Sequence, residues 1–276
     1  VLSVGWREQL RPCTGGARVF VVPNAYDPVL VDAVRHWRAR RWDRAARCRF
    51  LFLGPLTEAK GLGDLLNAAA RLRAERVPLR LLVAGPAAAA ERAAWWQRVR
   101  RAGLAGCVRL LPAVRGAAKA KLLAWSDVLV HPSHSEGLPL TVLEAAACDV
   151  PVIATAVGAV PELLGPMGGP SGGPPVPPRE PALLAAEMAA CVRAPYRRRA
   201  AGFALGAHVR RHYDVASVAR QVGAVYAPVL GLAAAVGVAT TARAAVAVGA
   251  GKSSQPERAG NTTSVPVLSS CSAHSA

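Results

Sequence analysis

Residues 128–147 read VLVHPSHSEGLPLTVLEAAA, and they combine the patterns of a buried strand, a glycine-containing loop and a helix. The apolar run at 128–130 is typical of a strand that is buried on both faces of a sheet. In an α/β protein, this order places backbone N–H groups and the positive end of a helix dipole at the carboxyl end of a strand, where phosphates bind. The stretch therefore predicts an anion-binding site at one edge of a parallel sheet.

Two carboxylates, Glu136 and Glu144, lie near this predicted phosphate site. Acidic groups beside a phosphate are electrostatically unfavourable unless they face hydroxyl groups, which sugar rings and ribose supply. The other interpretation is an acidic helix start followed by a solvated helical glutamate, because acidic residues are common near helix N-termini. The two residues alone leave both interpretations open.

The spacing of the two glutamates resembles the E-x7-E motif of retaining GT-B glycosyltransferases of family 4, also called group 1. Other segments resemble the same family in the same order: FLFLG at 50–54, KG at 60–61, PVIAT at 151–155 and VGAVPE at 157–162. The resemblance extends from about residue 49 to about residue 230. It implies a Rossmann-like, doubly wound parallel sheet, which forms the C-terminal half of a GT-B fold.

The apolar periodicity predicts the same α/β class without the resemblance, because repeated β-α-β units require a parallel sheet. Strands are expected at 50–54, 79–85, 108–111, 128–130 and 152–155, and helices at 60–76, 91–103, 117–125, after Pro139, at 181–192 and at 213–226. Residues 18–24 are expected to form a further short strand, and residues 34–47 are expected to be helical. The Gly/Pro-rich segment 165–181 is expected to be a surface loop.

We expect three parts along the chain. Residues 1–45 are interpreted as a remnant of an N-terminal domain with the interdomain linker, residues 46–230 as the nucleotide-sugar-binding domain, and residues 231–276 as a low-complexity, disordered tail. The chain is interpreted as a fragment, because it begins at Val1 with neither an initiator Met nor a signal-peptide pattern.

The charge balance indicates anionic partners. The chain has 34 Lys and Arg against 17 Asp and Glu, a net charge of +17. This excess suits a nucleotide-sugar or peripheral contact with an anionic membrane, while no motif indicates specific nucleic-acid binding. The six cysteines are scattered without a C-x-x-C pair, which argues against a zinc site and favours a cytoplasmic location. The uncharged stretch 221–242 is rich in Ala and Gly and contains Pro228, so we do not interpret it as a membrane span.

The resemblance implies roles for single residues. Lys60 is expected to contact the donor diphosphate, where its ammonium offsets the charge on the leaving group. Glu136 is the predicted catalytic residue, holding a hydroxyl of the donor sugar or stabilising a developing oxocarbenium ion. Glu144 is expected to bind the ribose hydroxyls. The other predicted donor-binding residues are Gly54, Ser135, Gly137 and Leu138. The motif implies neither a metal nor a cofactor.

Pro55 is the main departure from the family, which usually has an arginine there that is aimed at the diphosphate. Proline has neither a charge nor an N–H group. Another arginine takes this role, or donor binding is weak, or this copy is impaired. Weaker site candidates, for each of which a structural explanation is favoured, are His131, Ser133, His134 and Glu162.

The predicted function is retaining transfer of a sugar from a nucleoside-diphosphate-sugar to an unknown glycan or lipid acceptor, with this chain as mainly the donor-binding half. A glycosidase-type pair of carboxylates is not expected, because a ribose-bound Glu144 is too far from the scissile bond. One alternative is a GT-B epimerase-like enzyme, which needs acid and base residues in both domains. The other is a non-catalytic nucleotide-sugar-binding remnant, which Pro55 favours.

Overall fold

The computed structural model describes residues 1–39, 47–165, 168–170, 174–228 and 230. All elements given below belong to one unit. The expected tail at 231–276 lies outside the described residues. The division of the chain into an N-terminal remnant and a donor-binding domain stays a prediction.

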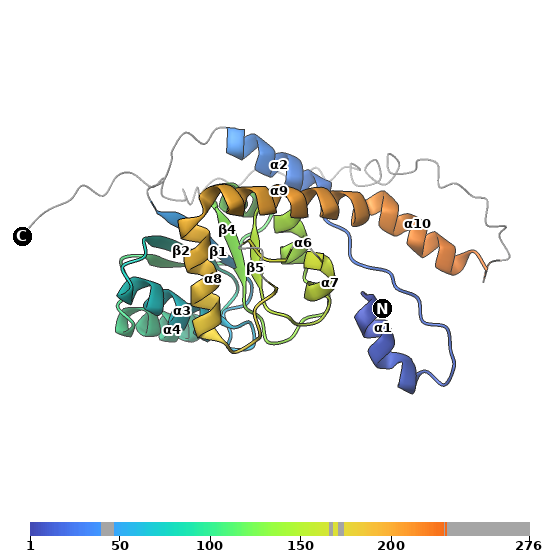
Figure 1. Ribbon diagram of the computed structural model, residues 1–276, viewed down its shortest axis with the longest axis horizontal. Coiled ribbons are helices and arrows are strands. Elements are labelled where there is room, and N and C mark those ends of the chain that lie inside the picture. The colour runs from blue at the N-terminus through green and yellow to red at the C-terminus, as the bar shows by residue number, and fades with distance from the viewer. Residues whose placement is uncertain (40–46, 166–167, 171–173, 229, 231–276) are drawn as a thin grey trace, which may run out of the picture. The chain divides into compact units, whose positions relative to one another are not determined.

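Five parallel strands form the centre of the unit in the order β3-β2-β1-β4-β5 (Figure 1). They are β1 (Cys48–Leu53), β2 (Leu79–Ala84), β3 (Val108–Leu111), β4 (Val128–His131) and β5 (Val152–Ala154). The chain runs outward from β1 to β3 and then returns to place β4 on the other side of β1. At such a reversal, the loops after two neighbouring strands diverge and leave a crevice where ligands bind. The predicted doubly wound parallel sheet is confirmed.

Helices cover both faces of this sheet. One face carries α3 (Leu62–Ala74), α4 (Ala89–Arg101) and α8 (Pro181–Arg193), and the other carries α2 (Pro28–Ala39), α5 (Gly116–Trp125) and α6 (Leu140–Ala147). Because side chains alternate across a strand, Phe50 and Phe52 of β1 pack into one core, and Leu51 and Leu53 pack into the other. Burial on both faces explains why residues 50–53 of β1 are a continuous apolar run.

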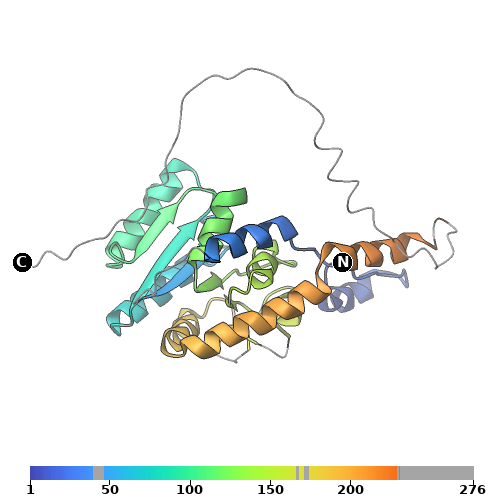
Figure 2. The ribbon, with the colours of Figure 1, turned by 90° about the horizontal axis from the view of Figure 1, so that it is seen from above.

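A long helix that the periodicity did not predict, α9 (Pro195–His212), runs across one edge of the sheet (Figure 1 and Figure 2). Arg198 of α9 donates a hydrogen bond to Cys48 at the start of β1, and Arg210 donates one to Asp149 in the turn before β5. Strand starts mark the amino edge, so α9 lies opposite the edge where the strands end. The remaining helices are α1 (Val4–Leu10), η1 (Arg11–Cys13), α7 (Val160–Leu164) and α10 (Val215–Tyr226).

The strand expected at 18–24 is wrong, because these residues have no regular secondary structure. Val22 N–H donates to the carbonyl of Val1 at 2.8 Å, and the Val1 amino group donates to Phe20 O at 2.9 Å, but these two bonds do not extend into a ladder. A run of β-branched residues forms a strand only where neighbouring strands pair with it. Its last residue, Asn24, instead bonds the loop after β4, with Asn24 Nδ2 donating to Leu138 O at 2.8 Å.

Two other expectations need smaller corrections. The helix expected at 34–47 is α2, which begins at Pro28 because proline suits the first helical turn, and residues 40–46 lie outside the described part. The expected surface loop at 165–181 is partly packed, because Val176 is buried and bridges Thr155 beside β5. No helix in the described part of the chain is both long and apolar enough to cross a membrane. Most of the uncharged stretch 221–242 lies outside that part.

Candidate functional site

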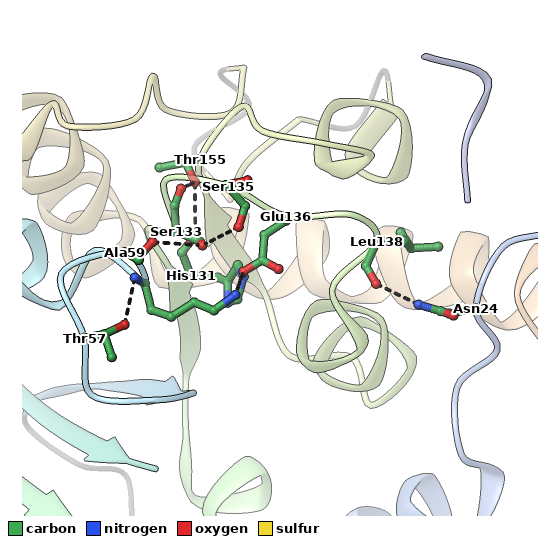
Figure 3. Close-up of polar contacts among 10 residues, drawn as sticks. Asn24, Thr57, Ala59, His131, Ser133, Ser135, Glu136, Leu138 and Thr155 are labelled. Carbon is green, nitrogen blue, oxygen red and sulfur yellow. Dashed lines mark hydrogen bonds and ion pairs between the residues drawn. The ribbon is translucent and has the colours of Figure 1, made fainter. Parts of the chain in front are cut away.

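The loops after β1 and β4 meet at the reversal of the sheet and bring Lys60 and Glu136 together. Lys60 Nζ lies 2.7 Å from Glu136 Oε1, although the two residues are 76 positions apart. In Figure 3, a dashed line at the Glu136 carboxylate marks this contact. Parallel pairing of β1 with β4 creates this contact, because it places both loops at the same edge.

A second donor, His131 at the end of β4, holds the same carboxylate (Figure 3). His131 Nε2 lies 2.8 Å from Glu136 Oε1, and both side chains are nearly buried. Burial on its own raises the pKa of Glu136, but hydrogen bonds with His131 and Lys60 outweigh it and lower the pKa to about 2. Glu136 is therefore ionised at neutral pH, so it accepts hydrogen bonds and has no proton to donate.

Buried hydrogen bonds fix the loop that carries Glu136 (Figure 3). The Ser133 hydroxyl donates to the carbonyls of Ser135 at 3.0 Å and Ala59 at 3.4 Å, and Thr155 Oγ1 donates to the carbonyl of Ser133. His134 N–H also donates to Ala59 O at 2.9 Å. Ser133 is fully buried, so its hydroxyl ties the loop after β4 to the loop after β1.

Two glycines allow neighbouring segments to approach this loop closely. Gly61 has φ +70°, and a Cβ there would lie 1.8 Å from the carbonyl oxygen of Pro132. Gly158 has φ +56°, and a Cβ there would lie 2.1 Å from the carbonyl oxygen of Glu136. Only glycine meets both the backbone conformation and the available space at these positions. The family-like KG and VGA segments thus support the Glu136 loop from two sides.

Free backbone donors lie directly beside Glu136. Among the described residues, the N–H groups of Gly137 and Leu138 donate to no acceptor, and α6 begins two residues later at Leu140. The Leu138 side chain is buried in the core, so a binding role for this residue can involve only its backbone. Ser135 is exposed, and its carbonyl accepts the Ser133 hydroxyl. This arrangement suits an anion, as the sequence predicts.

Glu144 lies on α6 and forms a different ion pair, with Lys119 of α5. The side chains of Glu144 and Lys119 are 13% and 21% exposed, so both remain reachable from solvent. The sequence analysis missed Lys119, because it belongs to no motif and only the placement of α5 and α6 on the same face of the sheet brings it to Glu144. The two glutamates therefore belong to two separate ion pairs, each with its own lysine.

Gly54 is the first residue after β1, and its N–H donates to Ala84 O at 3.1 Å. Pro55 follows it and is exposed. Arg92 does not replace the missing arginine, because its guanidinium donates to the carbonyls of Gly85 at 2.8 Å and Leu111 at 2.6 Å. Arg98 is paired with Glu58. Lys60 is thus the cation that this loop places against Glu136.

The other candidates have structural partners. His134 Nε2 lies 2.8 Å from Asp64 Oδ2, and the Glu162 carboxylate accepts the N–H groups of Val4 and Gly5 at the start of α1. The described part contains no group of three or more His, Cys, Asp or Glu side chains placed to hold a metal ion. The expectation that no metal is needed remains a prediction.

A family model described as Glycosyl transferases group 1 matches residues 47–194. The chain belongs to this family. The resemblance to group 1 glycosyltransferases is thereby confirmed, and the matched residues include both loops that carry Lys60 and Glu136.

Among curated relatives of this group 1 chain, the D-inositol 3-phosphate glycosyltransferase of Segniliparus rotundus is 35% identical over 162 residues. That match covers 58% of this chain and 35% of the relative. This chain spans about a third of the length of the first curated relatives it matches.

Two solved structures show the same fold. Sucrose-phosphate synthase from Thermosynechococcus elongatus has a TM-score of 0.72 and 24% identity, covering 84% of this chain and 58% of its own. Anabaena Alr3699/HepE, solved in complex with UDP, has a TM-score of 0.64 and 22% identity, covering 75% of this chain and 57% of its own. Both support the assignment of the sheet to one half of a GT-B fold.

Proposed function

We propose that this group 1 domain binds a nucleoside-diphosphate-sugar between the carboxyl ends of β1 and β4 and takes part in retaining transfer of the sugar to a glycan or lipid acceptor. One observation carries the proposal: Lys60, Glu136 and His131 form a hydrogen-bonded cluster beside free backbone N–H groups. A cation and backbone donors suit a diphosphate, and an adjacent carboxylate suits sugar hydroxyls.

The diphosphate competes with Glu136 for the Lys60 ammonium. Lys60 is 30% exposed, so its flexible side chain can turn toward a bound phosphate without disrupting the core. The N–H groups of Gly137 and Leu138 and the start of α6 add fixed positive charge at the same place. Charge that develops on the leaving nucleoside diphosphate is stabilised by these groups.

Glu136 remains bound to His131 when Lys60 turns to the phosphate, so the carboxylate keeps its position. Its pKa of about 2 makes it an acceptor for a sugar hydroxyl rather than a general acid. Glu144 likewise loses its contact with Lys119 and accepts hydrogen bonds from the ribose hydroxyls instead. We assign proton uptake from the acceptor hydroxyl to the leaving phosphate on the same face of the sugar, which gives retention.

The Anabaena structure, which has the same fold, was solved in complex with UDP, and this supports a nucleotide as ligand of the domain. A non-catalytic nucleotide-sugar-binding domain stays a second candidate, because Pro55 is exposed and supplies no charge where the family has an arginine. The two candidates share donor binding and differ in transfer.

Donor binding is tested by calorimetry on the 276-residue chain with UDP-, GDP- and ADP-sugars. We expect a Kd on the order of 0.1–1 mM for at least one of them. Lys60→Ala should weaken binding about tenfold or more, because a charge-assisted contact to phosphate is lost. Lys121→Ala is the control, because Lys121 lies over the Trp37 ring and outside the Glu136 cluster. Absence of heat with every donor, or equal loss in both variants, overturns the proposal.

A further inference from the structure

The outer side of α9 has a composition that is unusual for a solvent-exposed helix. Over its 18 residues, PYRRRAAGFALGAHVRRH, α9 carries five arginines and no acidic residue. Two of the arginines are explained by the fold: Arg198 donates to Cys191 O at 2.8 Å, and Arg210 donates to Asp149 Oδ1 at 2.7 Å. The remaining three arginines, Arg197, Arg199 and Arg211, are exposed.

We define the outer face of α9 by six exposed residues: Tyr196, Arg197, Arg199, Phe203, Ala207 and Arg211. Positions 196, 203 and 207 follow the helical spacing i, i+7 and i+11, so Tyr196, Phe203 and Ala207 form one apolar stripe. The exposed fractions are 91% for Tyr196 and 49% for Phe203. The arginines flank this stripe on both sides.

No carboxylate neutralises these arginines. In the part of the chain that the structure describes, Arg197, Arg199 and Arg211 form no ion pair. Arg199 instead lies over the Phe203 ring, with its guanidinium carbon 5.6 Å from the ring centroid. Asp149, which lies below the helix, is already bound by Arg210.

The inner side of α9 holds the helix in this orientation. A Cβ at Gly202 would lie 2.8 Å from Asp149 O, and a Cβ at Gly206 would lie 2.1 Å from Asp149 Oδ1. The helix therefore packs tightly on the amino edge of the sheet with one fixed side inward. Its outer face consequently points away from the carboxyl edge that carries Glu136.

We propose that the outer face of α9 docks on an anionic lipid bilayer. Charge complementarity supplies the attraction, because three unpaired arginines meet acidic headgroups, while Tyr196 and Phe203 enter the interfacial region. A convex helix with a narrow apolar stripe suits a flat, fluid surface, whereas an acidic protein partner needs shaped contacts that this face does not offer. Docking in this orientation leaves the carboxyl edge open to the aqueous phase.

The test is co-sedimentation of the full 276-residue chain with vesicles of phosphatidylcholine alone and of phosphatidylcholine mixed with phosphatidylglycerol. We expect binding to the mixed vesicles only, and weaker binding at high salt, because screening shortens electrostatic reach. Replacing the three arginines by glutamine (R197Q, R199Q, R211Q) should weaken partitioning about a hundredfold. Tyr196→Ser with Phe203→Ser should weaken it while leaving all charges in place.

The control removes three other exposed arginines, R100Q, R101Q and R109Q, which lie on α4 and on β3, the strand at the far edge of the sheet from β5. It should retain most of the vesicle binding, and circular dichroism should show that every variant is folded. Three outcomes overturn the proposal. They are an equal loss of vesicle binding in the control, no preference for anionic vesicles, and binding to an acidic polyanion without binding to vesicles. The vesicle measurement uses no nucleotide, so it is independent of the donor-binding test.

Discussion

At the scale of single residues, Glu136 is the centre of the site because two donors compete for one carboxylate oxygen. Lys60 and His131 both contact Glu136 Oε1, at 2.7 Å and 2.8 Å. A ligand phosphate can withdraw Lys60 without leaving the carboxylate unpaired, since His131 remains. This arrangement differs from a simple surface ion pair, where loss of one partner leaves the other to water.

The lowered pKa of Glu136 predicts how this carboxylate affects stability. Its value falls from 4.5 to about 2 in the folded state, so the ionised form stabilises the fold above pH 4.5. The contribution is about 3 kcal/mol at neutral pH, from roughly 1.4 kcal/mol per pKa unit. It is lost progressively as the pH falls from 4.5 through about 2, because the unfolded chain binds the proton first.

Denaturant unfolding of Glu136→Gln at several pH values measures this contribution. The variant should be less stable than the wild type at pH 7 by an amount that shrinks as the pH falls below 4.5. The matched control is Glu75→Gln at the exposed end of α3. A destabilisation by Glu136→Gln that is the same at all pH values would show that shape, not charge, matters at this position.

Pro55 provides a second prediction at the residue scale. If an arginine at this position contacts the diphosphate in the family, Pro55→Arg should tighten donor binding by about 1–2 kcal/mol, the scale of a charge-assisted hydrogen bond. Pro55 is exposed, so the substitution adds no buried charge. The reference is Pro55→Ala, which removes the proline ring without adding charge. Equal affinity for the two variants would mean that another residue already fills this role or that the diphosphate lies out of reach of residue 55.

At the scale of elements, the packing of α9 against the rest of the domain depends on glycine. A Cβ at Gly206 would lie 2.1 Å from Asp149 Oδ1 and 2.8 Å from Ala146 O, so Gly206→Ala should destabilise the domain by about 1–3 kcal/mol. Gly223 in α10 is the matched control, because nothing lies within 4 Å of a Cβ there. Gly223→Ala should stabilise by about 0.5–1 kcal/mol through helix propensity. Thermal unfolding that moves in the same direction for both variants contradicts this packing.

The strands could be predicted from the sequence because parallel strands buried on both faces are rich in continuous apolar runs, as residues 50–53 of β1 and 128–130 of β4 are. The helix α9 could not, because Gly202 and Gly206 interrupt its apolar pattern and its outer face mixes Arg with aromatic residues. The strand predicted at 18–24 is wrong for the opposite reason, since a β-branched run indicates a strand only where a partner strand exists.

The same contrast applies to the candidate site. The motif identified Glu136, Glu144 and Lys60, which have the spacing and context of the family. It did not identify the contacts that the fold makes between distant segments: the Lys60–Glu136 ion pair, the Lys119–Glu144 ion pair and the tie from Ser133 to Ala59. These depend on which strands are neighbours and which helices pack together.

At the scale of the whole molecule, the two edges of the sheet carry different features. Lys60 and Glu136 lie at the carboxyl edge, whereas α9 covers the amino edge with an outer face that carries arginines without acidic partners. Helix C-termini also gather at the amino edge, where basic residues complement the helix dipole. If α9 docks on a bilayer, an acceptor in solution or on an extended lipid-linked chain can reach the opposite edge.

The last prediction concerns transfer itself. The described residues 1–39, 47–165, 168–170, 174–228 and 230 belong to one α/β unit, and the chain spans 35% of its Segniliparus relative. In GT-B enzymes the acceptor is oriented in a cleft between two domains, and such orientation can lower a barrier by several kcal/mol, up to about 10. We therefore expect the 276-residue chain to bind donor with negligible sugar transfer, and transfer to appear when an acceptor-binding domain is fused upstream of Val1. In that fusion, Glu136→Ala should reduce kcat more than donor affinity, because its contact to the sugar strengthens as charge develops. Robust transfer by the chain alone refutes the need for a second domain, and equal losses in kcat and affinity reassign Glu136 to donor binding.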